Sequence, residues 1–442
     1  MSHSVGLVSI ITSEATQVLD NDIAYFVALI LAVGKHLLEF GPITRAGRLA
    51  GIYERFDNRP IPLLTEIPAA LLLVGQIQGV LGLVVGRKHC FMDAEHEEYC
   101  SPTVYKSVPS RLYRNLGNGR FEDVTEASGI GMALGKGMGI SIADFNGDGR
   151  MDIFVANDTE PNFLFINQGN GTFKESGLEY GVAYNSQGDS VSGMGCDARD
   201  FDNDGWVDIV YNDSSGQVFG LLHNEGGKSF SDITWSSKFG ALTRSQSGWS
   251  IGFIDYNNDG WKDIYSANGD VDDLSKTSKQ RDAMFKNLDG KTLEDVTAKM
   301  GPDFAFIGYQ RGSAFVDLNN DGFLDLVVTS LGEKPRILMN NALNGNHWLL
   351  LDLRGTKSNR SAIGATIKVV TTSGRVLYNH MNPSVGFMSS SDRRAHFGLG
   401  PETKIDRIEI RWPSGVRQRI DHPAVDQILK VIEPGADAPP TK

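Results

Sequence analysis

The amino-acid sequence predicts an all-β protein whose middle part is a β-propeller and whose last part is a smaller all-β domain. Two observations lead to this prediction. A nine-residue acidic loop recurs four times, with spacings of 56, 55 and 62 residues, and each copy lies between short runs of β-branched and aromatic residues. Repeated units that each carry four short strands are typical of propeller blades, which must stack to bury their faces.

The four acidic loops follow one pattern, D-x-[DN]-x-D-G-x-x-D, and we name them loop 1 (144–152), loop 2 (200–208), loop 3 (255–263) and loop 4 (317–325). The side chains at positions 1, 3, 5 and 9 and the carbonyl at position 7 converge and offer only oxygen. Oxygen ligands suit calcium and are wrong for zinc or copper. The predicted metal ligands are Asp144, Asn146, Asp148, Arg150 and Asp152; Asp200, Asp202, Asp204, Trp206 and Asp208; Asp255, Asn257, Asp259, Trp261 and Asp263; and Asp317, Asn319, Asp321, Phe323 and Asp325.

An EF-hand begins in the same way but needs a Glu at position 12 and flanking helices. Position 12 is Val155, Tyr211, Ser266 or Val328 here, and each loop leads into a strand-like run. We therefore expect calcium loops inside β-hairpins. The alternative, that Asp, Asn and Gly only form turns, is disfavoured because four copies share fixed offsets.

The strands around each loop are also repeated. A run of small residues precedes each loop, at 137–139, 193–195, 248–250 and 311–313, and a run that ends in Asn follows it, at 164–167, 221–224, 284–287 and 337–340. A further strand closes three of these units. Residues 112–115 and 119–125 form a fifth, partial unit at the start of the array.

The chain of 442 residues carries a net charge of −12, and 40% of its residues are hydrophobic, which is enough for two or three domains with cores of their own. Thirteen carboxylates occupy ligand positions in the loops, so the metal sites account for the acidity. The sequence contains no run of Lys and Arg residues that would indicate a nucleic-acid partner.

Three cysteines are present. Cys90 and Cys100 lie ten positions apart in a polar stretch. A disulfide between them is favoured over two alternatives, free thiols and a metal site with His89 or His96. Cys196 lies in an apolar strand and is expected to be an inert core residue.

Residues 1–88 differ from the rest, because they contain no acidic loop and no copy of the repeat. Residues 67–86 are uncharged and precede Arg87 and Lys88, so they meet the length criterion for a membrane helix. Four Gly, one Pro and two Gln weaken that reading. A buried or interfacial segment and a misassigned or aberrant start are the alternatives, and no clear signal peptide is present.

Several motifs carry a resemblance to known families. The acidic loops resemble the FG-GAP or VCBS repeats of the integrin-alpha type propeller, and 99–102, 111–115, 156–162 and 193–195 resemble motifs of one bacterial group of these proteins. Residues 346–349, 359–365, 396–400 and 412–415 resemble the ASPIC/UnbV domain. The resemblance covers roughly 89–432 and implies calcium-loop blades, of which the group has more than four or five, followed by that domain.

These observations divide the chain into an atypical N-terminal region (1–88), propeller repeats (89–341), an ASPIC/UnbV-like domain (342–434) and a disordered tail (435–442). The C-terminal domain is all-β on its own pattern, with strands expected over 348–353, 363–371, 407–412 and 416–420 and with Ile408 and Ile410 inward. A turn at 413–415 joins the last two strands.

No catalytic constellation stands out in the sequence. Three histidines of the C-terminal domain lie near a short charged run and are expected to be core or strand-edge residues: His347, His380 and His396, near Asp392, Arg393 and Arg394. The aromatic residues at loop position 7 are expected to pack between blades rather than to stack on sugars: Trp206, Trp261 and Phe323. Asp270, Asp272 and Asp273 are read as a solvated turn. The sequence therefore predicts a non-enzymatic, extracytoplasmic binding or adhesion protein that recognises a protein or glycan and binds about four calcium ions. The alternative is an enzyme or enzyme subunit that acts on polysaccharide.

Overall fold

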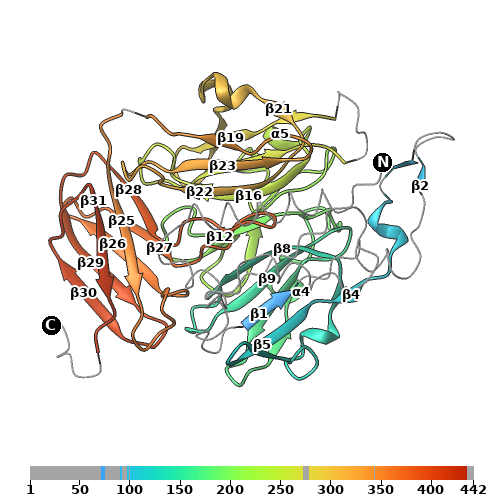
Figure 1. The fold of residues 1–442 in the computed structure, drawn as a ribbon, viewed down its shortest axis with the longest axis horizontal. Coiled ribbons are helices and arrows are strands. Elements are labelled where there is room, and N and C mark those ends of the chain that lie inside the picture. Colours follow the sequence, from blue (N-terminus) through green and yellow to red (C-terminus); the bar gives the residue numbers. More distant parts are fainter. Residues whose placement is uncertain are drawn as a thin grey trace, which may run out of the picture.

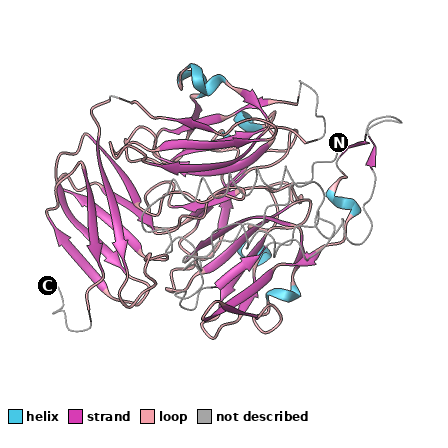
Figure 2. Cartoon of the chain, viewed as in Figure 1, coloured by secondary structure: helices cyan, strands magenta, loops and turns pink. Residues whose placement is uncertain are grey.

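The computed structural model describes residues 71–74, 90, 91, 97, 98, 100–271, 278–342 and 344–435. Within these residues the regular elements are almost all β-strands, and the helices are single short turns (Figure 2). None of the helices in this part of the chain has the length and apolar character needed to cross a membrane. The all-β prediction is therefore confirmed.

Five antiparallel sheets follow one another along the first three quarters of the chain (Figure 1). Each of the last four begins with the strand before an acidic loop and continues with the strand after it. The sheets are: sheet A, β1 (Leu71–Val74), β5 (Arg111–Gly117) and β6 (Arg120–Asp123); sheet D, β8 (Gly137–Ala143), β9 (Asp152–Asn157), β10 (Phe163–Asn167) and β11 (Phe173–Glu175); sheet F, β12 (Cys196–Arg199), β13 (Asp208–Tyr211), β14 (Gly220–Asn224) and β15 (Phe230–Asp232); sheet H, β16 (Gly248–Ile254), β17 (Asp263–Asn268), β19 (Ala283–Asn287) and β20 (Leu293–Asp295); and sheet J, β22 (Gln310–Val316), β23 (Asp325–Ser330) and β24 (Arg336–Leu338).

Short elements connect the sheets. They are β2 (Cys90–Phe91), β3 (Glu97–Glu98), β4 (Val108–Pro109), β7 (Leu134–Gly135), β18 (Gln280–Arg281) and β21 (Ile307–Gly308), the 3-10 turns η4 (Pro102–Val104), η5 (Ile130–Met132), η6 (Thr297–Lys299) and η7 (Pro302–Ala305), and the helices α4 (Gly177–Tyr180) and α5 (Phe239–Thr243).

The hydrophobic cores lie between neighbouring sheets. One core joins sheets A and D through Leu112 and Phe165, the next joins D and F, another joins F and H through Phe219 and Phe285, and a fourth joins H and J. The strands β8, β12, β16 and β22 contact one another in chain order. Because every sheet buries a face against its neighbours, the arrangement is that of propeller blades.

The C-terminal domain is a sandwich of two sheets, at the orange and red end of the chain in Figure 1. The first sheet holds β25 (His347–Arg354), β28 (Ala395–Gly400) and β31 (Gln427–Ile432), with β31 parallel to β25; the second holds β26 (Thr366–Thr371), β27 (Val376–His380), β29 (Ile405–Arg411) and β30 (Arg417–Asp421). Leu351, Ile367, Ile408, Ile410 and Trp412 form part of the core between them. The inward direction predicted for Ile408 and Ile410 is confirmed.

Two predicted strands begin later than expected. β26 begins at Thr366 instead of 363, because residues 359–365 form a turn in which Ile363 N–H donates to Asn359 Oδ1 at 2.9 Å. β12 begins at Cys196 instead of 193, because Gly195 N–H donates to the Asn212 side chain at 2.8 Å instead of to a ladder carbonyl. Side-chain amides thus replace strand hydrogen bonds at both places.

The N-terminal region contributes one strand to the first sheet. β1 pairs antiparallel with β5, so that Leu71 lies opposite Arg114. Residues 71–74 are the only described part of the segment considered as a membrane helix, and they are a strand; the rest of 67–86 lies outside the described residues, as do Asp272 and Asp273.

Both cysteine predictions agree with the structure. Cys90 and Cys100 form a disulfide with their Cα atoms 5.1 Å apart. Cys196 is fully buried, and burial raises the pKa of its thiol to about 12. A thiol in that setting stays protonated and unreactive.

Phe285→Ala tests the packing between sheets. Phe285 is 0% exposed, and its ring centroid lies 5.3 Å from that of Phe239 in the core between sheets F and H. We expect the substitution to lower the free energy of unfolding by about 3–5 kcal/mol in urea denaturation at fixed calcium concentration. Phe121→Ala, at a side chain that is 37% exposed, is the matched control and should change it by less than about 1 kcal/mol; equal effects would contradict the packing.

Candidate metal-binding face

The four acidic loops occupy equivalent places in their sheets. Each connects the first strand of a sheet to the second: loop 1 joins β8 to β9, loop 2 joins β12 to β13, loop 3 joins β16 to β17, and loop 4 joins β22 to β23. All four therefore lie at corresponding ends of neighbouring sheets. The prediction that they lie inside β-hairpins is confirmed.

The first aspartate of each loop accepts a hydrogen bond from the backbone of position 6. The N–H groups of Gly149, Gly205, Gly260 and Gly322 donate to the first carboxylate at 2.7, 2.8, 2.8 and 2.9 Å. These glycines have φ values of 90°, 99°, 84° and 87°, a region that other residues avoid. The predicted sharp turn at position 6 is thus present in every loop.

The fifth residue fixes the second half of the turn. The N–H of position 7 donates to the Asp148, Asp204, Asp259 or Asp321 carboxylate at 2.8 to 3.0 Å. The N–H of position 5 donates to the side chain of position 3 in each loop, as Asp148 N–H does to Asn146 Oδ1 at 3.0 Å. The backbone N–H groups of positions 5, 6 and 7 therefore hold the side chains of positions 3, 1 and 5 in the same way in every loop.

The ninth residue is the most buried member of the set. Asp152, Asp208, Asp263 and Asp325 are all 0% exposed. One oxygen of each accepts the N–H of an asparagine at or just after the end of the third strand, which is Asn167, Asn224, Asn287 or Asn340, at 2.7 to 2.8 Å. The recurring Asn therefore holds the ninth carboxylate in place.

Burial raises the pKa of these carboxyls. It raises the pKa of Asp152, Asp200 and Asp255 to about 7 and that of Asp208 to about 6. The pKa of Asp263 is also raised, by burial and then by the neighbouring Asp255. A group of carboxyls this close and this buried is costly to ionise unless a cation is present.

Two further observations indicate that the loop oxygens suit a hard cation. Asp144 Oδ1 and Asp263 Oδ2 are buried and have no hydrogen-bond partner. Asp200, Asp202 and Asp208 in loop 2 bring one oxygen each to within 4.8 Å of one another. Buried oxygens without donors are expected where an ion supplies the missing contact.

Cationic side chains form ion pairs with carboxylates of loops 1, 2 and 3. Arg150 pairs with Asp148 at 2.5 Å and Lys286 with Asp259 at 3.1 Å. His223 lies 3.1 Å from Asp208 Oδ1 and 3.7 Å from Asp202 Oδ2, and the hydrogen bond to Asp208 raises its pKa to about 9. His223 could not be selected from the loop pattern, because it lies outside the loops, on β14.

The asparagines also connect one loop to the next. Asn224 Nδ2 donates to Phe145 O, Asn287 Nδ2 to Phe201 O, and Asn340 Nδ2 to Tyr256 O, at 2.9, 3.0 and 2.7 Å. Each acceptor is position 2 of the preceding loop. A chain of side-chain amides thus links loops 1 to 4.

The C-terminal domain lies against all four loops. A residue of that domain sits over the position-6 glycine of each: Arg411 over Gly149, Tyr378 over Gly205, Arg375 over Gly260 and Trp348 over Gly322, each close enough that an added Cβ would be within 3.4 Å of it. None of these four contacts follows from the loop pattern.

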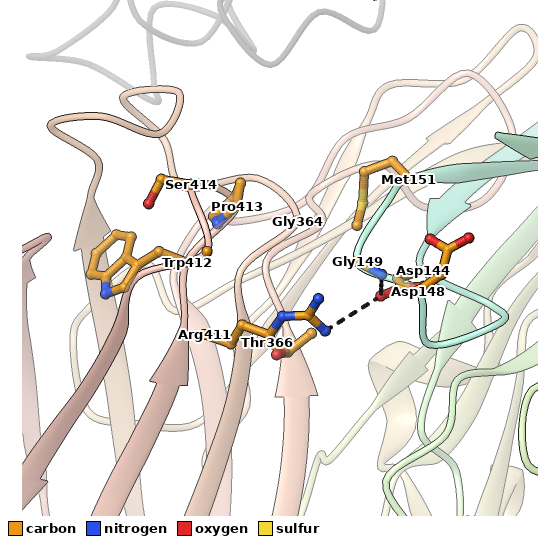
Figure 3. Close-up of a pocket in the computed structure, with 11 residues that line it drawn as sticks. Asp144, Asp148, Gly149, Met151, Gly364, Thr366, Arg411, Trp412, Pro413 and Ser414 are labelled. Atoms are coloured by element: carbon orange, nitrogen blue, oxygen red, sulfur yellow. Dashed lines mark hydrogen bonds and ion pairs between the residues drawn. The ribbon is translucent and has the colours of Figure 1, made fainter. Parts of the chain in front are cut away.

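A cleft of about 190 Å³ lies between loop 1 and this domain. Asp144, Asp148 and Met151 line one side, and Arg411 and Pro413 are on the other (Figure 3). Arg411 points toward the loop, and its Nη1 lies 3.8 Å from Asp144 Oδ2.

The aromatic residues at position 7 pack against neighbouring turns. A Cβ at Gly147 of loop 1 or at Gly227 would lie 2.8 or 2.6 Å from the Trp206 ring, and a Cβ at Gly290 would lie 2.8 Å from the Trp261 ring. Trp206 therefore packs between sheets D and F, as expected.

Two of the three histidines have hydrogen-bond partners at their rings, and the third, His380, is buried with no partner at its Nε2 among the described residues. His347 Nδ1 lies 2.6 Å from Asp426 Oδ2, and His396 Nε2 lies 3.0 Å from Gly322 O. His380 is 5% exposed, and burial lowers its pKa well below the usual value. Asp392 pairs with Arg394 at 2.5 Å. These contacts agree with the interpretation as core and strand-edge residues.

Comparison with family models identifies both parts of the chain. A model described as "FG-GAP-like repeat" matches residues 104–155, 144–211 and 200–266, and one described as "ASPIC and UnbV" matches residues 355–438. The chain is an FG-GAP-like repeat protein with an ASPIC and UnbV domain. Loop 4 lies outside the matched repeats, yet its hydrogen bonds follow the same pattern as those of loops 1 to 3.

Two curated relatives are similar to most of this chain, and the similar region makes up just over half of each relative. Cartilage acidic protein 1 of Mus musculus is 27% identical over 383 residues, covering 82% of this chain and 57% of its own. The Homo sapiens protein of the same name is 26% identical over 383 residues, covering 82% and 56%. The FG-GAP-like chain therefore spans little more than half the length of these relatives.

Solved structures show weaker likeness. An Agrocybe aegerita lectin aligns with a TM-score of 0.32 and 19% identity over 52% of this chain and 60% of its own. The BP39L lectin from Burkholderia pseudomallei aligns with a TM-score of 0.31 and 10% identity over 71% and 90%. Scores this low carry no functional meaning.

Asn287→Ala tests the link between loops. The change removes the amide donors to Phe201 O at 3.0 Å and Lys262 O at 3.2 Å and leaves both buried carbonyls without these partners. We expect a loss of about 1–3 kcal/mol in the free energy of unfolding, measured by denaturant titration. The exposed Asn341 is the control, and Asn341→Ala should have no measurable effect. Equal losses in the two variants would contradict the assigned role.

The raised carboxyl pKa values predict how stability without metal depends on pH. Asp152, Asp200 and Asp255 have a folded pKa of about 7 against an ordinary 3.8. Their contribution is complete below pH 3.8 and is lost as the pH rises through 7, because the unfolded state releases these protons first. In chelator, the melting temperature should therefore fall from pH 5 to pH 8. A rise over this range would contradict the assignment.

Proposed function

We propose that this protein is a calcium-stabilised, extracytoplasmic binding or adhesion protein without catalytic activity. The observation that carries the proposal is the hydrogen-bond pattern that the four loops share, in which backbone N–H groups of one turn hold the side chains of positions 1, 3 and 5 and the ninth carboxylate is buried. In loop 2, Asp200, Asp202 and Asp208 also bring one oxygen each to within 4.8 Å of one another. Calcium takes six to eight such oxygens. The residues that would hold it are the loop positions predicted from the sequence, with the position-7 carbonyls of Arg150, Trp206, Trp261 and Phe323.

Two features support a location outside the cytoplasm. Extracellular calcium modules bind at roughly 0.1–1 mM, concentrations that the cytoplasm does not offer. The Cys90–Cys100 disulfide is a bond that persists in oxidising compartments. The mouse and human relatives are named for cartilage and for acidity, and this chain is acidic as well, with a net charge of −12.

The proposed partner is a protein or glycan bound by the propeller and the C-terminal domain. The contacts of His347, His380, His396 and Asp392 are structural, which favours binding over catalysis. Pull-down on immobilised glycans and proteins, combined with an assay for new reducing ends on common polysaccharides, separates the two functions. Retention without product is expected; product that increases with protein concentration would support the alternative, an enzyme that acts on polysaccharide.

Calcium dependence is tested by thermal melts in millimolar calcium, in equal magnesium and in chelator. A ligand that binds only the folded state at about a hundred times its dissociation constant stabilises it by ~2.7 kcal/mol per site. Four sites acting together would therefore shift the melting temperature by many degrees. We expect a large fall in chelator that calcium reverses and magnesium does not. An unchanged melt would contradict the proposal.

A further inference from the structure

We propose that the C-terminal domain is part of the calcium-binding apparatus: Arg375, Trp348 and their neighbours position the loops for the ion, so that docking of this domain and calcium binding are thermodynamically linked. The inference rests on the proposed function, because it takes calcium as the ligand of the loops. It adds residues from outside the loops to the binding site.

The first support is the contact of the C-terminal domain with the backbone at position 6. Trp348 lies so close over Gly322, and Arg411 over Gly149, that any side chain at either glycine would collide with it. A Cβ at Gly260 would lie 2.5 Å from Arg375 Nη2. The domain therefore packs directly on the backbone of position 6, in the space that the missing Cβ of each glycine leaves, most rigidly where the Trp348 ring covers Gly322.

The second support is a set of hydrogen bonds to loop carbonyls. Arg375 Nη2 donates to Asp259 O at 2.7 Å, and Arg394 Nη2 donates to Asp317 O at 2.8 Å. Gly400 N–H donates to Asn258 O at 2.7 Å. These carbonyls belong to the residues that carry the metal ligands or to their direct neighbours, so docking fixes the backbone from which the ligands project.

The third support is that the same contacts extend from loop to loop. Asn203 Nδ2 at position 4 of loop 2 donates to Gly260 O at 3.0 Å, and Asn258 Nδ2 of loop 3 donates to Gly322 O at 3.1 Å. At position 4 of loop 4, Asn320 Oδ1 accepts from Arg394 Nη1 at 2.7 Å. The position-4 asparagine thus contacts the next loop in loops 2 and 3, and contacts the C-terminal domain in loop 4.

Linkage follows from these contacts. An ion draws the carboxylates of a loop together and holds the turn, and the turn is the shape that the C-terminal domain contacts. By reciprocity, the factor by which calcium favours docking equals the factor by which docking favours calcium.

The domain also has an anchor outside the loops. Gly386 N–H donates to Cys196 O on β12, and Asp392 N–H donates to Phe315 O on β22, both at 2.8 Å. This segment between β27 and β28 lies along the first strands of the blades. We therefore expect calcium removal to loosen the interface over the loops without separating the two parts.

The test is a calcium titration of the full chain by isothermal calorimetry, with Arg375→Ala, Trp348→Ala and the control Arg417→Ala. Arg417 is an exposed residue on β30 of the same domain. Removal of a cation near an ion site strengthens calcium binding by simple electrostatics, whereas loss of a positioning contact weakens it. The sign of the change therefore separates the two effects.

We expect Arg375→Ala and Trp348→Ala to weaken calcium binding about 3- to 30-fold, a coupling in the usual range, with the stoichiometry retained and the control unchanged. Arg375→Lys, which keeps a donor for Asp259 O, should recover part of the affinity. In hydrogen exchange, calcium should protect 376–380 and 395–400 in the wild type and less so in Arg375→Ala.

Wild-type or tighter calcium binding by both interface variants would overturn the linkage and leave the calcium proposal intact. A wild-type protein that binds no calcium would instead overturn the proposed function and the linkage with it. Trp348→Ala keeps the charge of the protein, so it tests the linkage independently even where Arg375→Ala is affected by charge.

Discussion

The ninth carboxylate of each loop is the constraint on which the rest of the structure depends. It is fully buried where the loop leads into the second strand, and one of its oxygens is held by an asparagine at or just after the end of the third strand. That asparagine also reaches the preceding loop. In sheets F, H and J, a single Asp–Asn pair therefore joins the acidic loop, the sheet and the preceding blade, and this explains why the loop and the distant Asn recur together.

The C-terminal domain gives this face a second role. Its residues lie over the position-6 glycines and donate to loop carbonyls, and its segment at 382–392 lies along the first strands of the blades. The glycines then satisfy two requirements: a backbone conformation that other residues avoid, and the space for a neighbouring side chain. The propeller and the sandwich are separate in their cores but share one polar interface.

Much of the propeller could be predicted from the sequence because its signals are local. Loop pattern, strand composition and spacing are all properties of short segments, and the hairpin position of loops 1 to 4 follows from them. The interface could not be predicted, because contacts such as Arg375 with Asp259 and Trp348 with Gly322 join residues far apart in the chain. His223 was missed for the same reason: only pairing of β13 with β14 brings it to Asp208. The late start of β26 was missed because the Asn359 side chain competes with the strand.

We propose that the four acidic loops bind calcium together. The most direct measurement is the number of calcium ions bound per folded chain, by equilibrium dialysis with metal analysis, for the wild type and for Asp208→Asn. We expect about four ions for the wild type and at least one fewer for the variant, with magnesium failing to compete at equal concentration. A wild-type chain that retains no calcium, or a variant that retains as much as the wild type, would contradict it.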